Sequence, residues 1–133
     1  MPNRRPLGLE LLPDPVRSVV SSALERSERI IWGAAAVGCT LVLTDRRLLL
    51  VRDGTQYRPR TGLQAWALDR SLTIRLTAGR ERIRLMIESS GHAVSVFVAA
   101  VQATAVTRLV AEARQRIYAG DDPPDTLDPP DPS

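Results

Sequence analysis

The sequence contains no lysine, one cysteine and only five aromatic residues among its 133 positions. Because all 18 basic residues are arginine, every basic side chain is a planar guanidinium, which pairs bidentately with carboxylate and phosphate groups. The single cysteine, Cys39, excludes an internal disulfide and a cysteine-based zinc site, and we expect it to be a small buried apolar residue. Five scattered aromatic residues are too few for a surface that stacks nucleic-acid bases.

Long hydrophobic runs are also missing. The longest nearly apolar run, residues 30–43, is shorter than the about 20 residues that a membrane-spanning helix needs, and Gly33 and Gly38 interrupt it. The first ten residues contain arginines but no long apolar stretch, so we expect no secretory signal. A chain of this length with 44% hydrophobic residues has material for one modest core. These features predict a soluble cytoplasmic protein.

Charge is distributed unevenly along the chain. Residues 121–133 hold five aspartates, five prolines and no basic residue, whereas the other 120 residues carry 18 basic and 10 acidic side chains, a net charge of +8. A segment so rich in proline and like charge cannot bury a core, so we expect residues 120–133 to form a disordered acidic tail. A basic body with an acidic tail indicates an anionic partner, or a tail that screens the body.

The apolar periodicity predicts two helices on either side of a region of short strands. Residues 1–13 are expected to form a flexible arm. A helix over 14–28 begins with Asp14 as its cap and proline in its first turn, and we expect it to lie across an open sheet edge or to mediate self-association. A second amphipathic helix over 101–118 ends at Gly120. Alternating apolar residues and turn residues predict seven strands between them, at 30–36, 40–44, 47–52, 64–68, 72–77, 82–88 and 93–98.

The alternation also predicts a register for the fifth and sixth strands. A two-residue type II′ loop that begins at Gly79 would pair Leu76 with Ile83. This register places Arg75 opposite Arg84, and facing like charges destabilise a sheet. A slip of one residue would move arginines into the core, so the register is well specified.

The next hairpin turns at residues 90–91, which pairs Leu85 with Val96 and places Arg84 opposite Phe97. Arg75, Arg82 and Arg84 project from the polar face of the fifth and sixth strands. An anion, the acidic tail or stacking of Arg84 on Phe97 would offset the repulsion between them. The alternative, which we weigh equally, is a hydrated basic face that salt partly screens.

Seven antiparallel strands followed by one amphipathic helix is the order of the pleckstrin-homology (PH) fold. Residues 44–51, Thr-Asp-Arg-Arg-Leu-Leu-Leu-Val, resemble the second-to-third strand hairpin of small bacterial PH-like proteins and of the related GRAM domains. Residues 28–31 resemble the start of their first strand. The resemblance implies an α+β, mostly β architecture, a partly open barrel of about seven antiparallel strands capped by the C-terminal helix, with an extra N-terminal helix here. We expect the PH-like domain to span residues 29–119.

The family implies binding rather than catalysis. In members that bind inositol phosphates the loop between the first two strands is basic, whereas here it is the short, uncharged pair at residues 37–38, which argues against phosphoinositide-type recognition. The resemblance places the loop after the third strand at the open end of the barrel. Arg52, Arg58 and Arg60 in this region have the chemistry to bind phosphate bidentately; the alternative is a solvated surface loop.

Two further pairs of residues have both a functional and a structural interpretation. Arg46 and Arg47 could contact an anion or a partner, but we favour a structural role in which Asp45 stabilises the turn and Arg47 pairs with a nearby carboxylate. Trp32 and Trp66 are expected in the core rather than on a ligand platform, although Trp66 could also anchor at a membrane interface.

Catalytic patterns are missing. His92 is the only histidine, and no nucleophile elbow surrounds the nearby serines. There is no glycine loop that would cradle a phosphate and no pair of carboxylates on one predicted element. The sequence therefore predicts no enzymatic activity, no bound metal and no cofactor.

Together these features predict a non-enzymatic PH-like binding module whose arginine-rich surface engages an anionic membrane surface or an acidic protein segment. The candidate contacts are Arg52, Arg58, Arg60, Arg75 and Arg84. The alternative is a protein-interaction or oligomerisation module with no lipid binding, in which the tail of one copy docks on the arginines of another. Nucleic acid is disfavoured, because no helix gathers arginines at positions that read a groove and the acidic tail would compete.

Overall fold

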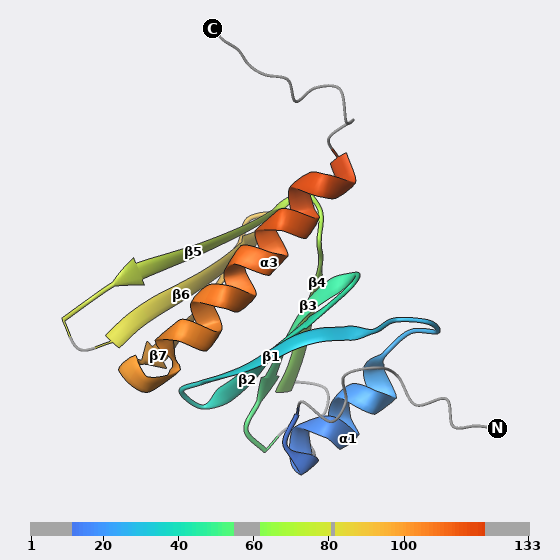
Figure 1. The fold of residues 1–133 in the computed structure, drawn as a ribbon, viewed down its shortest axis with the longest axis horizontal. Coiled ribbons are helices and arrows are strands. Elements are labelled where there is room, and N and C mark those ends of the chain that lie inside the picture. The colour runs from blue at the N-terminus through green and yellow to red at the C-terminus, as the bar shows by residue number, and fades with distance from the viewer. Residues whose placement is uncertain (1–11, 55–61, 81, 122–133) are drawn as a thin grey trace, which may run out of the picture.

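The computed structural model describes residues 12–54, 62–80 and 82–121 (Figure 1). Within these residues, seven antiparallel strands form two sheets, and within each sheet every strand pairs with the next along the chain. The first sheet contains β1 (Ile30–Ala36), β2 (Cys39–Thr44), β3 (Arg47–Arg52) and β4 (Leu63–Ala67). The second contains β5 (Leu72–Ala78), β6 (Arg82–Ser89) and β7 (His92–Ala99). The helices are α1 (Asp14–Ala23), the short 3-10 helix η3 (Ala100–Gln102) and α3 (Ala103–Asp121).

The predicted fold class is confirmed. Seven strands precede a C-terminal helix and follow an N-terminal one, and each strand begins and ends within one residue of its predicted position. The two sheets do not close into a continuous barrel. They meet where the backbone N–H of Val37, in the β1–β2 turn, donates to the carbonyl oxygen of Phe97 on β7 at 2.9 Å.

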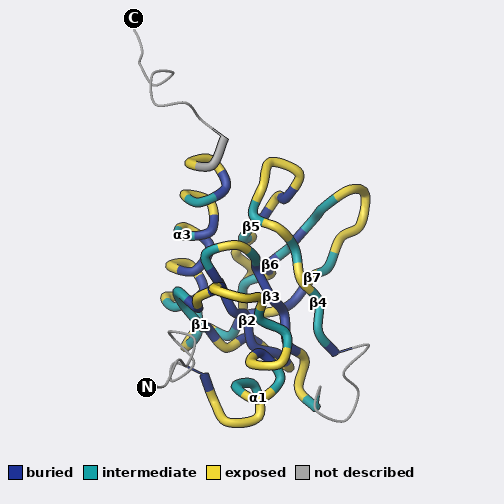
Figure 2. Tube along the Cα trace, turned by 90° about the vertical axis from the view of Figure 1, so that its right-hand side faces the viewer, coloured by how far each residue is buried: buried dark blue, intermediate teal, exposed yellow. Residues whose placement is uncertain are grey.

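The main core lies between the inner faces of the two sheets and α3. In Figure 2 the buried segments gather in the middle of the molecule, along β2 and β3. The predicted apolar stripe of the C-terminal helix is confirmed, because five of its residues are buried in this core: Val106, Leu109, Val110, Ala113 and Ile117. Trp32 and Trp66 are half-buried against the same core, as expected, and the indole Nε1 of Trp32 donates to the carbonyl of Ala105 at 3.2 Å.

Helix α1 covers the outer face of the first sheet. Val20 on α1 packs with Val42 on β2 and with Leu49 and Val51 on β3, all of them buried. The first sheet is therefore covered on both faces, which explains why its central strands read as nearly continuous apolar runs. The prediction that this helix lies across a sheet edge or mediates self-association is wrong in placing it at an edge: its apolar stripe is buried on a sheet face of the same chain.

The ends of the helices differ from the prediction. Pro13 rather than Asp14 occupies the N-cap of α1, no side chain caps it, and Asp14 instead pairs with Arg17 at 3.1 Å. The helix ends at Ala23, well before residue 28, and the linker that follows turns through Ser27 with a φ of +69°. At the other end of the chain, α3 begins at residue 103, after η3, and continues to residue 121.

The predicted β6–β7 register is confirmed, with Leu85 opposite Val96 and Arg84 opposite Phe97. The predicted β5–β6 register is wrong by two residues. Leu76 faces Leu85 instead of Ile83. A shift of two residues leaves every side chain on its predicted face, since side chains alternate with a period of two.

The corrected β5–β6 register changes the neighbours of the arginines. Arg75 faces Met86, and Arg84 faces Thr77. The direct opposition of Arg75 and Arg84 therefore does not occur in the folded chain.

The reason for the shift is the conformation of the turn at Gly79. Its N–H donates to the carbonyl oxygen of Arg82 at 2.9 Å, so Gly79 lies opposite Arg82 and the turn is centred one residue later in the chain than predicted. A type II′ turn would give Gly79 a positive φ, which it does not have. Glycine is needed for another reason: a Cβ at this position would lie 2.8 Å from the Arg82 oxygen.

Most of the predicted arm (residues 1–13) and of the acidic tail (residues 120–133) lies outside the described residues, as do Arg58 and Arg60. The boundaries proposed for these segments therefore stay predictions. Among the helices that the structure describes, none is long and apolar enough to cross a membrane.

The burial of Leu49 tests whether α1 covers the sheet. Replacing this fully buried side chain, as in Leu49→Ala, should lower the free energy of unfolding by about 2–4 kcal/mol, because a cavity forms beneath α1. Val37→Ala, at a residue that is 50% exposed, is the control and should cost less than about 0.5 kcal/mol. Urea denaturation measures both; equal small losses would mean that α1 does not cover this face in solution.

Candidate functional site

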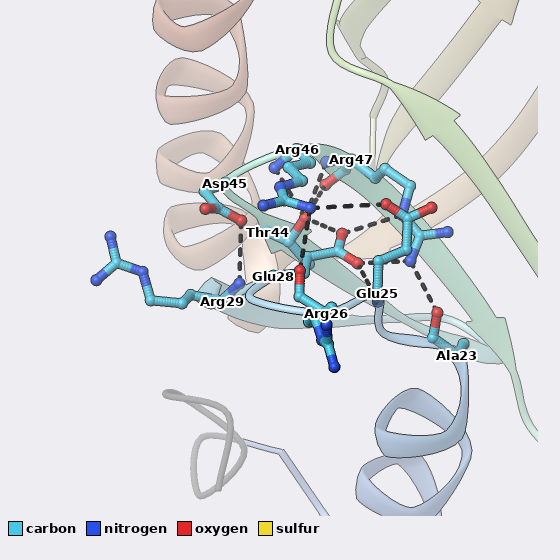
Figure 3. Close-up of polar contacts among 9 residues, drawn as sticks. All are labelled: Ala23, Glu25, Arg26, Glu28, Arg29, Thr44, Asp45, Arg46 and Arg47. Carbon is cyan, nitrogen blue, oxygen red and sulfur yellow. Dashed lines mark hydrogen bonds and ion pairs between the residues drawn. The ribbon is translucent and has the colours of Figure 1, made fainter. Parts of the chain in front are cut away.

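The Thr-Asp-Arg-Arg segment forms a buried polar cluster with the linker that precedes β1 (Figure 3). At its centre is Glu28, whose side chain is 0% exposed. Arg47 grips this carboxylate with both nitrogens of its fork, Nε to Oε2 at 3.0 Å and Nη2 to Oε1 at 2.6 Å. The Nη2 group also donates to the carbonyl of Ala23, the last residue of α1, at 2.9 Å. Arg47 is thus committed to a structural role.

Thr44 and a backbone amide complete the coordination of the Glu28 carboxylate. The hydroxyl of Thr44 donates to Oε2 at 2.6 Å, and the N–H of Glu25 donates to Oε1 at 2.9 Å. The same Thr44 oxygen accepts the backbone N–H groups of Arg46 and Arg47, at 3.0 and 2.8 Å. A buried charge is tolerated only when it is paired and hydrogen-bonded, and here both carboxylate oxygens are satisfied twice.

Asp45 and Arg46 fasten the outside of the same turn. Asp45 accepts the N–H of Arg29 on its carboxylate at 3.0 Å and donates its own N–H to the Arg29 carbonyl at 2.9 Å. Arg46 donates to the carbonyl of Arg26 at 3.2 Å and lies 3.9 Å from the Glu25 carboxylate. The favoured structural interpretation of this turn is confirmed.

The hydrogen bonds of Glu28 control its ionisation. Burial alone would raise the pKa of this carboxyl group, but hydrogen bonds from Arg47, from the Glu25 N–H and from Thr44 lower the pKa to about 2. The reciprocal hydrogen bond with Glu28 raises the pKa of Arg47. Both groups stay charged across the physiological range, so this cluster is a fixed structural element rather than a switch.

A second polar feature lies on the outer face of the second sheet, at the β5–β6 turn. In Figure 1 this turn is at the opposite end of the molecule from α1. A hollow of about 420 Å³ is lined by residues 77–80 of the turn and by Arg82, Arg84 and Phe97. We call this feature the arginine hollow, and its three arginines are Arg80, Arg82 and Arg84.

Two arginines of the hollow contact the ring of Phe97. The guanidinium carbon of Arg82 lies 4.1 Å from the centroid of its ring and that of Arg84 lies 5.9 Å from it. The expected contact between Arg84 and Phe97 is therefore present, but Arg82 makes the closer one. Such cation–π contacts are worth about 0.5–1 kcal/mol at exposed sites, enough to favour one arrangement of the two side chains without removing their hydrogen-bond donors.

The arginines of this face have no ion pair among the described residues, which leave out Glu81, between Arg80 and Arg82 in the sequence. Among the residues that the structure describes, no carboxylate forms an ion pair with Arg75, Arg80, Arg82 or Arg84. Arg75 lies on the same outer face, on β5. Guanidinium groups gathered without carboxylates create a local positive potential that attracts anions.

The structure brings some of the predicted contacts together and separates others. Arg75 and Arg84 share the outer face of the second sheet. Arg52 ends β3 in the first sheet and lines another hollow, of about 270 Å³, beside the start of α1. Arg58 and Arg60 lie outside the described residues.

Sequence reasoning missed two residues. One was Arg80, which the alternation of arginines at positions 80, 82 and 84 could have indicated. The other was Glu28 as the carboxylate that pairs with Arg47. The two residues are far apart in the sequence, and no local pattern joins them.

The remaining candidates have structural surroundings. Cys39 is buried in the main core, and burial raises the pKa of its thiol to about 11, so it stays protonated. His92 is exposed at the start of β7. Trp32 has the guanidinium of Arg108 at 5.0 Å from its ring in addition to its packing against α3.

The low pKa of Glu28 predicts a stability loss in acid. The pKa of the Glu28 carboxyl group is about 2 in the folded chain and 4.5 without the contacts of the fold. Its contribution to the free energy of unfolding is therefore complete above pH 4.5 and is lost as the pH falls from there toward 2. The difference corresponds to about 3 kcal/mol. Glu28→Gln should remove this component and also cost about 3–5 kcal/mol at neutral pH, since it leaves Arg47 unpaired.

Glu25→Gln is the matched control, because Glu25 is 60% exposed and 3.9 Å from Arg46. The free energy of unfolding is measured by urea titration between pH 2 and 7. If both variants keep the acid sensitivity of the parent chain, Glu28 is not the group responsible.

Comparison with known proteins bears on the fold. No protein-family model matches the sequence, and no curated protein matches it. Among solved structures, the chain is similar to the pleckstrin homology domain from Shewanella amazonensis SB2B, with a TM-score of 0.52 and 14% sequence identity over 76% of this chain and 96% of that one. The chain therefore has a pleckstrin-homology-like fold, as the order of its strands and the Thr-Asp-Arg-Arg hairpin predicted.

Proposed function

We propose that this chain is a non-enzymatic binding module that engages an anionic partner through the arginine hollow. The observation that carries the proposal is the set of arginines at the β5–β6 turn, which lines a hollow together with an exposed aromatic ring and has no carboxylate paired to it in the described residues. The PH-like fold supports a binding role in general terms.

The chemistry of the hollow suits phosphate and carboxylate groups. Each guanidinium presents five N–H donors and no acceptor, in a fork that matches two oxygens of one anion. The arginines of the hollow are exposed, so each contact is weak and is screened by salt. Binding therefore requires several contacts at once, which a membrane surface with many headgroups or an acidic peptide segment supplies.

The same residues give little support to catalysis. The hollow is lined by arginines, Phe97 and small turn residues, and an arginine stays protonated at any physiological pH. It can hold a negative charge in place, but it does not accept a proton as a general base.

A second candidate is a protein-interaction or oligomerisation module without lipid binding. Exposed apolar side chains favour it: Val101 on η3 is 90% exposed, and Val37 and Phe97 are 50% and 36% exposed. Aromatic and apolar anchors surrounded by arginine are typical of protein interfaces.

Co-sedimentation with vesicles tests the proposal. The full chain should sediment with anionic vesicles and not with neutral ones, and less as salt rises. Arg82→Thr with Arg84→Thr should weaken this binding about tenfold, because two charge-assisted contacts are lost. Threonine keeps the strand propensity of these exposed positions.

The control carries the same loss of charge elsewhere. Arg26 and Arg29 are exposed, and their hydrogen bonds in the cluster of Figure 3 use backbone atoms only. The variant with threonine at both positions should bind almost as well as the parent chain. Equal weakening of both variants would show that net charge alone drives binding, and no binding at low salt would overturn the membrane partner.

A further inference from the structure

We infer that the arginine hollow receives the acidic tail of a second copy of this chain. The inference rests on the proposed function, because it uses the same arginines, and it names a partner for them. Three observations support it: the spacing of the aspartates, the spacing of the arginines, and the distance between the hollow and the end of α3.

Four of the five aspartates in residues 121–133 recur at every third position. They are Asp122, Asp125, Asp128 and Asp131, with four prolines between them and a fifth directly after Asp131. Proline favours the polyproline II conformation, which has three residues per turn and a rise of 3.1 Å per residue. In that conformation all four carboxylates fall on one edge, about 9 Å apart.

The arginines also form a row, with a shorter spacing. Arg82 and Arg84 are alternate residues of β6 on the outer face, so their Cα atoms are about 6.6 Å apart. Arg80 extends the row into the turn, and Arg75 on β5 extends it in the other direction, because it faces Met86, the next outward residue of β6 after Arg84. Long flexible arginine side chains bridge the difference between the two spacings.

Phe97 adds a contact for the prolines of the tail. Proline-rich segments in the polyproline II conformation dock on aromatic-lined grooves, because their backbone loses little conformational entropy on binding. Phe97 is 36% exposed in the centre of this face. The tail thus complements the hollow in charge, and its prolines suit the exposed ring of Phe97.

The tail of the same copy starts at the far end of α3 from the hollow. Helix α3 packs against the inner face of the second sheet, where Val98 and Ile74 contact its apolar stripe, whereas the hollow opens on the outer face. The hollow lies near the start of α3, since Arg82 pairs with Ala99 just before η3. The 19 residues of α3 carry the chain about 28 Å away from that point.

Residues 122–133 span at most about 37 Å in a polyproline II conformation. Most of that length would be used in returning along α3, and the remainder would have to pass around the edge of the sheet before any aspartate met an arginine. A second copy has no such constraint. Self-association through the tail therefore depends on protein concentration, and the tail competes with any other anion for the hollow.

Sedimentation velocity on the full chain tests this inference. The parent chain should self-associate at low salt as its concentration rises. The arginine variant, with threonine at positions 82 and 84, should not, and neither should a tail variant with asparagine in place of Asp122, Asp125, Asp128 and Asp131. We expect a fall of about tenfold or more in the association constant of each. The control with threonine at positions 26 and 29 should associate like the parent.

Mixing the two deficient variants gives the sharper result. The tail variant keeps an intact hollow and the arginine variant keeps an intact tail, so an equimolar mixture should form a heterodimer although neither variant associates alone. A full chain with the same tail composition but with its aspartates grouped together should associate several-fold less well than the parent. Failure of the mixture to associate would overturn the inference.

The outcomes separate this inference from the proposed function. The tail variant should bind anionic vesicles several-fold more tightly than the parent chain, because its tail no longer competes with the vesicles for the arginine hollow. If the parent chain does not self-associate and the tail variant binds vesicles no better, the inference is wrong while the hollow remains an anion site. If threonine at positions 82 and 84 leaves vesicle binding unchanged, the proposed function itself fails.

Discussion

The ion pair between Glu28 and Arg47 is the contact on which the arrangement of the first sheet depends. Its carboxylate is fully buried, so it must stay paired, and breaking such a pair costs about 3–5 kcal/mol. Arg47 reaches from the start of β3 both to this carboxylate and to the carbonyl of Ala23. One side chain thereby fixes the end of α1, the linker before β1 and the β2–β3 hairpin. Because α1 covers Leu49, the same contact also secures the outer face of the sheet.

This constraint divides the arginines of the chain into two groups. Arg46 and Arg47 donate to oxygens of the linker, and Arg47 cannot serve a partner without leaving the buried Glu28 carboxylate unpaired. Arg82 and Arg84 contact only an aromatic ring among the described residues, which orders them and leaves their donors available. A chain without lysine thus uses the guanidinium fork for architecture in one sheet and, under the proposed function, for recognition in the other.

Local patterns predicted most of the fold. Strands whose apolar residues alternate, or run continuously where a sheet is covered on both faces, could be placed within one residue. The β5–β6 register could not, because the position of the turn follows from the close approach of the Arg82 carbonyl to Gly79, which no residue pattern reveals. Glu28 was missed as the partner of Arg47 for a similar reason, because a polar pair between residues far apart in the chain produces no periodic pattern in the sequence. Arg84 was identified from its place on a polar strand face, whereas Arg80 in the turn belongs to no such face.

The most direct test of the central claim, that recognition and architecture use separate arginines, is an NMR titration of the nitrogen-15-labelled full chain with inorganic pyrophosphate. The account predicts that amide and arginine Nε–H shifts concentrate at Gly79, Arg80, Arg82, Arg84 and Phe97, while those of Arg46 and Arg47 stay unchanged. Shifts centred on residues 44–47, or spread evenly over all arginines, would contradict it.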